Sequence, residues 1–192
     1  MDTLEIINLK SCAHRISIPT SQDISRNRLN LEISGLGIVF FSPTSVAHIE
    51  EGEDYFDSHF NEPSEVAQHV NECALTCFGT GGPGEYNLEF SLSKYPGAGY
   101  DNSDIAIRLG IEVKDRVLIF RDLYSMLDWD KDFSSDAKFE LDNGFYLVTV
   151  CTSLPSTGLL GDSQNIKLWF EAKSKKTEIN WPGVPMLIPG NV

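Results

Sequence analysis

Basic residues are scarce in this sequence. Its 15 Lys and Arg residues stand against 28 Asp and Glu residues, which gives a formal net charge of −13 at pH 7. A protein that binds nucleic acid or an anionic membrane surface needs clustered cations. The composition therefore predicts that this protein binds neither nucleic acid nor membrane, and it favours a basic protein partner.

Long apolar runs and a secretion signal are also missing. No run approaches the ~18 apolar residues of a helix that spans a bilayer. Residues 1–14 lack the basic segment and the apolar centre of a signal peptide. We therefore expect a cytoplasmic protein whose cysteines are reduced thiols. The cysteines are Cys12, Cys73, Cys77 and Cys151.

Catalytic motifs are a further absence. The sequence has no G-x-S-x-G turn, and none of its four histidines lies in a catalytic sequence setting. The glycine-rich residues 78–86 lack the Gly-Lys-Ser/Thr of a phosphate-binding loop, and Glu85 would repel a phosphate. The sequence alone leaves open whether the fold brings together a catalytic triad or a pair of catalytic carboxylates. We predict that the protein is not an enzyme and needs no cofactor.

One group of residues has the chemistry of metal ligands. His69, Cys73 and Cys77 are spaced by four residues within a predicted helix, so they would share one helix face. A tetrahedral zinc site needs a further ligand, and the sequence offers no companion pair. Small thiols on an apolar helix face usually belong to the core. We predict no metal site, and metal binding by these three residues is the open alternative.

Strand patterns dominate the chain. Three runs rich in Ile, Val, Phe and Leu are separated by short polar breaks, as in the strands of one sheet or of two packed sheets. They span residues 104–114, 116–130 and 139–151, with one or two helical turns expected within 122–129. Further strands are predicted over residues 4–9, 15–18, 29–33, 37–41, 86–93 and 165–172. Ser34 and Gly35 predict a hairpin turn, with a positive φ at the glycine.

Only one stretch has a convincing helical period. Residues 63–78 carry apolar side chains at spacings of three and four, and Pro63 suits a first helical turn. Residues 45–62 are polar and acidic, which predicts a long loop or a short frayed element. The tail from residue 179 to residue 190 has three prolines, and we expect it to lie extended along a sheet edge.

These elements predict a mainly β fold, an antiparallel β-sandwich with one or two short helices. The alternative is an α+β fold with two smaller halves that meet near residues 94–103. We expect a single domain over residues 1–192, in which residues 1–95 could form an N-terminal subdomain and residues 96–192 a β-rich part.

Acidic residues are concentrated in one stretch. No Lys or Arg lies between Arg28 and Lys94, whereas this stretch holds eleven acidic residues, eight of them within residues 50–72. Acidic clusters steer association and aromatic side chains anchor it. The candidate contact residues are Glu50, Glu51, Glu53, Asp54, Tyr55, Phe56 and Asp57. A second patch comprises Asp128, Trp129, Asp130 and Asp132. The alternative is a solvated acidic loop and helix face without a partner.

Four segments resemble a known family in order and spacing. They are residues 121–130 (RDLYSMLDWD), 143–150 (NGFYLVTV), 161–171 (GDSQNIKLWFE) and 181–187 (WPGVPML). Over residues 116–188 the chain resembles β-rich immunity proteins, which are encoded beside bacterial polymorphic toxins, including type VI secretion effectors. The resemblance implies a protein that binds a cognate toxin and blocks its active site without catalysis. It assigns no contact residue.

The function predicted from these observations is neutralisation of a basic, cytoplasm-acting toxin through an acidic surface. The alternative is a carbohydrate- or ligand-binding β-sandwich in which Tyr100, Trp129, Trp169 or Trp181 stacks on the ligand. The tryptophans distinguish the two hypotheses. Exposed coplanar rings favour a sugar, whereas buried rings beside exposed acids favour a protein partner.

Overall fold

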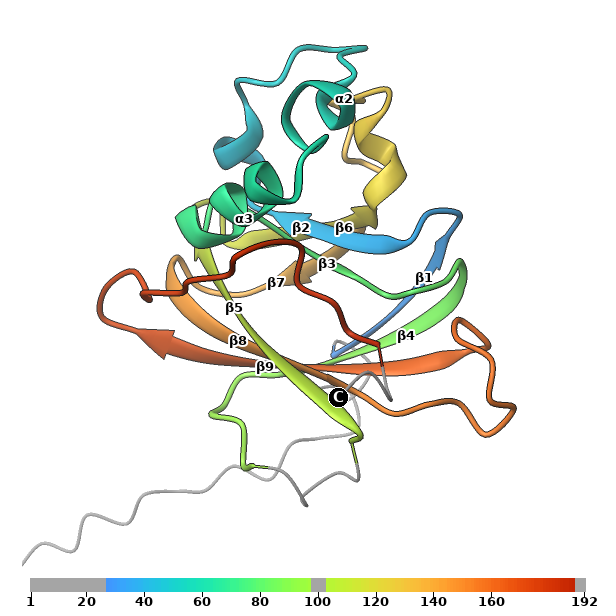
Figure 1. Ribbon diagram of the computed structural model, residues 1–192. Coiled ribbons are helices and arrows are strands. Elements are labelled where there is room, and N and C mark those ends of the chain that lie inside the picture. The colour runs from blue at the N-terminus through green and yellow to red at the C-terminus, as the bar shows by residue number, and fades with distance from the viewer. Residues whose placement is uncertain (1–26, 98–102, 189–192) are drawn as a thin grey trace, which may run out of the picture.

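The computed structural model describes residues 27–97 and 103–188. Two β-sheets face each other, and short helices cover the outer side of the smaller sheet (Figure 1). The larger sheet has the order β1 (Arg28–Ile33), β4 (Gly84–Ser91), β9 (Gln164–Lys173), β8 (Gly144–Thr152), β5 (Ile105–Val113). The smaller sheet has the order β3 (Leu75–Gly79), β2 (Gly37–Phe41), β6 (Val117–Asp122), β7 (Ala137–Glu140). The predicted mainly β fold with short helices is confirmed.

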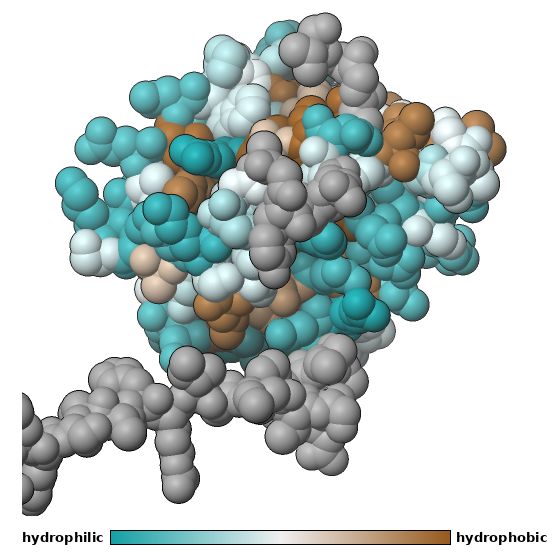
Figure 2. Space-filling model, turned by 90° about the horizontal axis from the view of Figure 1, so that it is seen from below, coloured by the Kyte–Doolittle hydropathy of each residue, from teal (hydrophilic) through white to brown (hydrophobic). Residues whose placement is uncertain are grey.

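The helical elements all lie above the four-stranded sheet in Figure 1. They are η1 (Pro43–Val46), α2 (Tyr55–His59), α3 (Pro63–Glu72) and η2 (Leu123–Met126). Strand β2 is buried along its whole length because this sheet is covered on both faces. Strand β4 instead alternates buried and partly exposed residues, since one face of the larger sheet meets solvent. Figure 2 views the larger sheet from that side, where hydrophobic residues are scattered among hydrophilic ones.

The core between the sheets is rich in aromatic rings. Phe90 of β4 stacks on Phe139 of β7 with ring centroids 4.2 Å apart, and it contacts Phe120 of β6 at 5.2 Å. Phe40 of β2 stacks on Phe120 at 5.1 Å. Such ring pairs stabilise a core beyond their buried area. Both sheets take strands from before and after residues 94–103, and the single-domain organisation remains a prediction.

The predicted hairpin between β1 and β2 is wrong. Strand β1 pairs with β4, whereas β2 pairs with β3 and β6, so the chain crosses from one sheet to the other at Ser34 and Gly35. The carboxylate of Asp122 holds this corner by accepting from the Ser34 amide at 2.8 Å and hydroxyl at 2.7 Å. Gly35 does not have a positive φ. A Cβ there would lie 2.6 Å from Asp122 Oδ1, so the glycine is needed for space.

The predicted helix over residues 63–78 is too long. It ends at Glu72, because Cys73 adopts a left-handed conformation (φ 60°), and the following residues form β3. Cys77 therefore lies on a strand, and the predicted shared helix face with Cys73 is wrong. An apolar run can pack in a helix or in a buried strand, and pairing with β2 decides the outcome here.

Both sheet edges near α3 are covered. Along β3, the Gly79 amide donates to Pro185 O and the Leu187 amide donates to Gly79 O, each at 2.8 Å, which confirms the prediction for the C-terminal tail. Along β5, Thr76 Oγ1 donates to Gly110 O at 2.6 Å and Trp181 Nε1 donates to Arg108 O at 2.9 Å. These bonds occupy edge groups that would otherwise be open to strand pairing.

Two observations complete the fold. The strands predicted over residues 4–9 and 15–18 lie outside the described residues, as do Cys12 and Tyr100. No helix in the described part of the chain is long and apolar enough to span a bilayer.

Candidate binding surface

The two acidic segments predicted from the sequence lie side by side. The Gly52 amide donates to Trp129 O at 2.8 Å, and the Trp129 amide donates to Glu53 O at 3.1 Å. Lys131 adds a second connection, because its amide donates to Glu51 Oε2 at 2.8 Å. We call the combined region the acidic surface. Its acidic residues are Glu50, Glu51, Glu53, Asp54, Asp57, Asp128, Asp130 and Asp132, all exposed except the half-buried Glu53.

Local hydrogen bonds shape the first segment. Asp54 caps α2 by accepting from the Asp57 amide at 2.8 Å. Glu53 Oε2 accepts from the Glu50 amide, also at 2.8 Å. A carboxylate that accepts backbone N–H groups fixes the turn around it. The side chains of Glu50 and Asp57 hold no backbone group in this network, and both are exposed, although Glu50 also lies 3.4 Å from the Lys131 ammonium.

Arg121 of β6 holds the second segment from below. Its side chain is buried and pairs with Asp136, with Nε and Nη2 lying 2.8 and 2.7 Å from Oδ2. Nη1 donates to Asp130 O at 2.8 Å and Nη2 to Asp132 O at 3.2 Å. One buried guanidinium thus satisfies one carboxylate and two loop carbonyls, which fixes residues 130–136.

Arg121 is not among the functional residues predicted from the sequence. Its guanidinium also lies over the Trp129 ring at 5.4 Å and the Phe133 ring at 4.8 Å, within the range of cation–π contacts. The available signal was the position of this arginine within the apolar strand that ends at Asp122. A long charged side chain at a core position of a strand needs partners on the neighbouring loop.

Two predicted anchors are buried. Tyr55 is 3% exposed and Trp129 is 1% exposed. Trp129 packs on Phe41 with ring centroids 5.3 Å apart, and Tyr55 packs among histidines. Their rings therefore support the acidic surface from inside and are not available as surface anchors. Phe56 is half-buried, and it is the predicted aromatic anchor that a partner can reach.

Exposed apolar residues lie in η2 and directly after it, just before the second acidic segment in the chain. Tyr124 is 41% exposed and Leu127 is 45% exposed. The Tyr124 ring meets the Phe56 ring edge to face at 6.2 Å. We call Phe56, Tyr124 and Leu127 the apolar ridge. Its sequence signal was the helical turn over residues 122–129, in which Met126 points into the core and the neighbouring positions point outward.

A cavity of about 390 Å³ opens beside the second segment. Its charged lining residues are Arg121, Asp122, Asp128, Asp130 and Asp136. Asp122 already accepts from Ser34, and Asp136 already pairs with Arg121. Four carboxylates against one guanidinium leave this concavity negative, and a low-dielectric concave wall concentrates such a field. The cavity extends the negative potential of the acidic surface towards β1.

Hydrogen bonding keeps one exposed acid strongly ionised. The backbone and side chain of Ser134 donate to Asp132 and hold the pKa of this carboxyl below its usual range. Bonds to the charged form of a carboxyl stabilise that form. Asp132 therefore carries its negative charge throughout the neutral range.

The three candidate metal ligands are separated by the fold. His69 faces Tyr55, while Cys73 Sγ lies near Thr177 O and Cys77 lies within β3. Burial raises the pKa of the Cys77 thiol to about 12, so it stays protonated and is a poor ligand. Within residues 27–97 and 103–188, no group of His, Cys, Asp or Glu side chains is arranged to hold a metal ion.

The described tryptophans differ in environment. Trp129 is buried, Trp169 is half-buried against Tyr95 with ring centroids 6.0 Å apart, and Trp181 donates to a backbone carbonyl. Trp129, buried beside exposed acids, matches the criterion for a protein partner, and none of the three described tryptophans is fully exposed as the criterion for a sugar requires.

Comparisons with known proteins are sparse. No protein-family model matches the chain, and no curated protein matches its sequence. One similar solved structure is named Crocagin biosynthetic gene J, with a TM-score of 0.49 and 15% identity over 74% of this chain and 95% of that chain. Another is ComJ from Bacillus subtilis, an inhibitor of the DNA-degrading activity of NucA, with a TM-score of 0.44 and 11% identity over 76% of this chain and 95% of that chain. Similarity at this level transfers no function.

Proposed function

We propose that this protein binds a basic protein partner through the acidic surface and neutralises it without catalysis, as an immunity protein does with its toxin. The observation that carries the proposal is the union of the two acidic segments. Residues 50–57 and 128–132 are far apart in the chain, yet backbone hydrogen bonds join them, and the apolar ridge adjoins both segments. Acids at the rim and apolar side chains at the centre are the usual anatomy of a protein interface.

The charge of the surface defines the partner. Lys131 is the basic residue within the acidic surface, and its ammonium already lies 3.4 Å from Glu50 Oε2. The remaining carboxylates need cations on the partner, because like charges across an interface are costly. An enzyme that acts on a polyanion has a basic substrate cleft, and an acidic protein that fills this cleft blocks access. A basic toxin acting on nucleic acid or a nucleotide in the cytoplasm is the partner class that fits.

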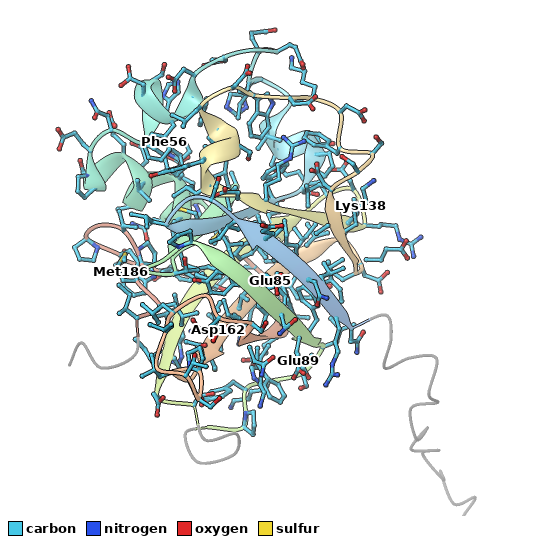
Figure 3. All side chains as sticks on the ribbon, turned by 90° about the vertical axis from the view of Figure 1, so that its right-hand side faces the viewer. Phe56, Glu85, Glu89, Lys138, Asp162 and Met186 are labelled. Atoms are coloured by element: carbon cyan, nitrogen blue, oxygen red, sulfur yellow. The ribbon has the colours of Figure 1, made fainter. Side chains whose placement is uncertain are left out.

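Charge reversal tests the proposal once a partner has been co-purified from the source cell. The test variant is Glu50→Lys/Asp57→Lys/Asp128→Lys, which removes charges without breaking a backbone hydrogen bond of the acidic surface. The control is Glu85→Lys/Glu89→Lys/Asp162→Lys, and these residues lie far from Phe56 in Figure 3. We expect the test variant to associate about tenfold more slowly or worse, with a weaker salt dependence, and the control to associate normally.

The apolar ridge supplies the second half of the test. Tyr124→Ala and Leu127→Ala should speed dissociation, each weakening the complex by about 1–2 kcal/mol, because truncated anchors act mainly on the dissociation rate. If the charge and ridge variants bind and inhibit as the wild type does, the partner uses another surface. If no basic partner co-purifies, the neutralising function is overturned.

A further inference from the structure

Three histidines gather around one buried tyrosine beneath the acidic surface. Tyr55 is the first residue of α2, and its hydroxyl lies 2.9 Å from His69 Nε2 on α3 and 3.4 Å from His48 Nε2. His59 stacks obliquely on the Tyr55 ring with centroids 4.4 Å apart. The hydroxyl therefore joins residues 47–57, which carry half of the acidic surface, to α3.

The Glu65 carbonyl determines which atoms donate and which accept in these hydrogen bonds. His69 Nδ1 lies 2.9 Å from Glu65 O, which can only accept, so Nδ1 carries a hydrogen. In the neutral ring, Nε2 is then an acceptor and takes the hydroxyl hydrogen of Tyr55. His48 Nε2 must accordingly donate to the Tyr55 oxygen. At neutral pH the array runs from His48 through Tyr55 and His69 to the Glu65 carbonyl.

Proton uptake changes this array in two steps. A proton on His69 Nε2 turns that nitrogen into a donor to Tyr55, and the tyrosine hydrogen turns to His48 Nε2, whose own hydrogen moves to Nδ1. All contacts survive this first step in reversed direction. A second proton makes both nitrogens donors. The Tyr55 hydrogen then has no acceptor in the array, and Tyr55 is too buried to find one in water.

Two carboxylates lie near this array. Burial raises the pKa of Tyr55, and the negative charges of Glu53 in the loop and Glu72 on α3 raise it further. No Lys or Arg lies between Arg28 and Lys94. Lys175 and Lys176 line a cavity with Glu72 on another side of α3. From α2, the neighbouring titratable ring is His59.

We propose that proton uptake by His48 and His69 weakens the contact between residues 47–57 and α3 and so loosens half of the acidic surface at mildly acidic pH. Histidine is the side chain that changes charge between about pH 5 and pH 8. The array is thus a pH-sensitive support for the binding loop. Residues 130–136 are excluded from the effect, because Arg121 keeps its charge throughout this range.

Hydrogen–deuterium exchange tests the proposal without any partner. Amide exchange of residues 50–57 is compared between about pH 7.5 and about pH 5.5, after correction for the intrinsic rate. We expect protection to fall about tenfold on acidification in the wild type, and residues 130–136 to change little. In His69→Gln and in His48→Gln this fall should disappear. His59→Gln is the matched control, since His59 contacts the ring but not the hydroxyl, and it should retain the fall.

Each outcome decides the proposal. An unchanged wild type overturns it, and so does a fall that persists in a folded His48→Gln or a folded His69→Gln, which would assign the effect to other groups. If His69→Gln unfolds, His48→Gln at the exposed end of the array gives the answer. The result is independent of the proposed function, because a failed exchange experiment leaves the charge-reversal test intact.

Discussion

The two halves of the acidic surface present the same chemistry to solvent but rest on different supports. Residues 130–136 are held by Arg121, a buried charge with a carboxylate and two carbonyls as partners. Residues 47–57 are held through the Tyr55 hydroxyl and two histidine nitrogens. The first support carries a permanent charge, whereas the second depends on its protons. One surface can therefore have a half that is fixed and a half that responds to pH.

The largest expected effect is the loss of the permanent support. Arg121→Met keeps an apolar stem but leaves Asp136 and two loop carbonyls without their donor. Breaking a buried pair by removing one partner destabilises a protein by about 3–5 kcal/mol. We expect this loss in urea unfolding. The control is Arg116→Met, whose ion pair with Asp142 is exposed and should change stability by less than about 1 kcal/mol. Equal losses in both variants would contradict the role of Arg121.

The next effect concerns the titratable support. Tyr55→Phe keeps the packing but removes the hydroxyl between His48 and His69, and we expect a loss of about 1–2 kcal/mol at neutral pH. Tyr124→Phe is the control, because this ring is 41% exposed and should tolerate the change. Thermal unfolding of both variants measures the difference. If Tyr55→Phe has the same thermal stability as the wild type, the hydroxyl contributes no net stability.

A carboxylate between β5 and β6 sharpens the comparison, because it bonds to Ser42 and Thr44, just before residues 47–57. Burial raises the pKa of Asp115, but hydrogen bonds from Thr44 and Ser42 outweigh it and hold the pKa below the usual value. A depressed pKa contributes stability that is present above the unfolded value and is lost as pH falls through the folded value. Asp115 is exposed, so solvent screening limits the effect. Asp115→Asn should therefore cost less than about 1 kcal/mol at neutral pH, and the difference from the wild type should vanish in strong acid. Urea midpoints across this pH range check the sign.

The smallest effect is expected where the two halves meet. The Lys131 ammonium pairs with Glu50, whose side chain is 81% exposed, whereas the Lys131 amide makes the firmer bond to Glu51. Lys131→Ala removes the exposed ion pair and keeps the backbone amide that bonds to Glu51, so stability should change by less than about 0.5 kcal/mol. A larger loss in chemical unfolding would show that the side chain, and not the backbone, joins the halves.

Strands were the most predictable part of the fold because their patterns are local. The alternation over residues 86–93 gave β4, and the apolar runs gave β5, β6 and β8. The predicted β1–β2 hairpin was wrong because a glycine turn between two strands also suits a corner at which the chain crosses between two sheets. The predicted helix was too long because the apolar residues within 74–78 fit a helical pattern as well as a strand pattern. The pairing of this segment with β2 is not visible in the local sequence.

The candidate site was predictable in composition but not in arrangement. The acids of residues 50–57 and 128–132 stand out by charge, and their exposure follows from the cost of burying a carboxylate. Their adjacency depends on hydrogen bonds between Gly52, Glu53 and Trp129, which no local pattern encodes. The sequence predicts Tyr55 and Trp129 as surface anchors, because an aromatic residue in a polar stretch gives no sign of whether its ring faces solvent or the core. In the structure both rings pack into the core beneath the acidic surface.

The position of β9 has a consequence for biosynthesis. This strand lies between β4 and β8 in the larger sheet, and it pairs with β4 in parallel. On the ribosome, β4 emerges long before its neighbour, and the sheet cannot close until residue 173 has left the exit tunnel. Strands that wait with open edges and apolar faces are exposed to aggregation. We therefore expect nascent chains of this protein to expose the edges of β4 and β8 until β9 has been synthesised.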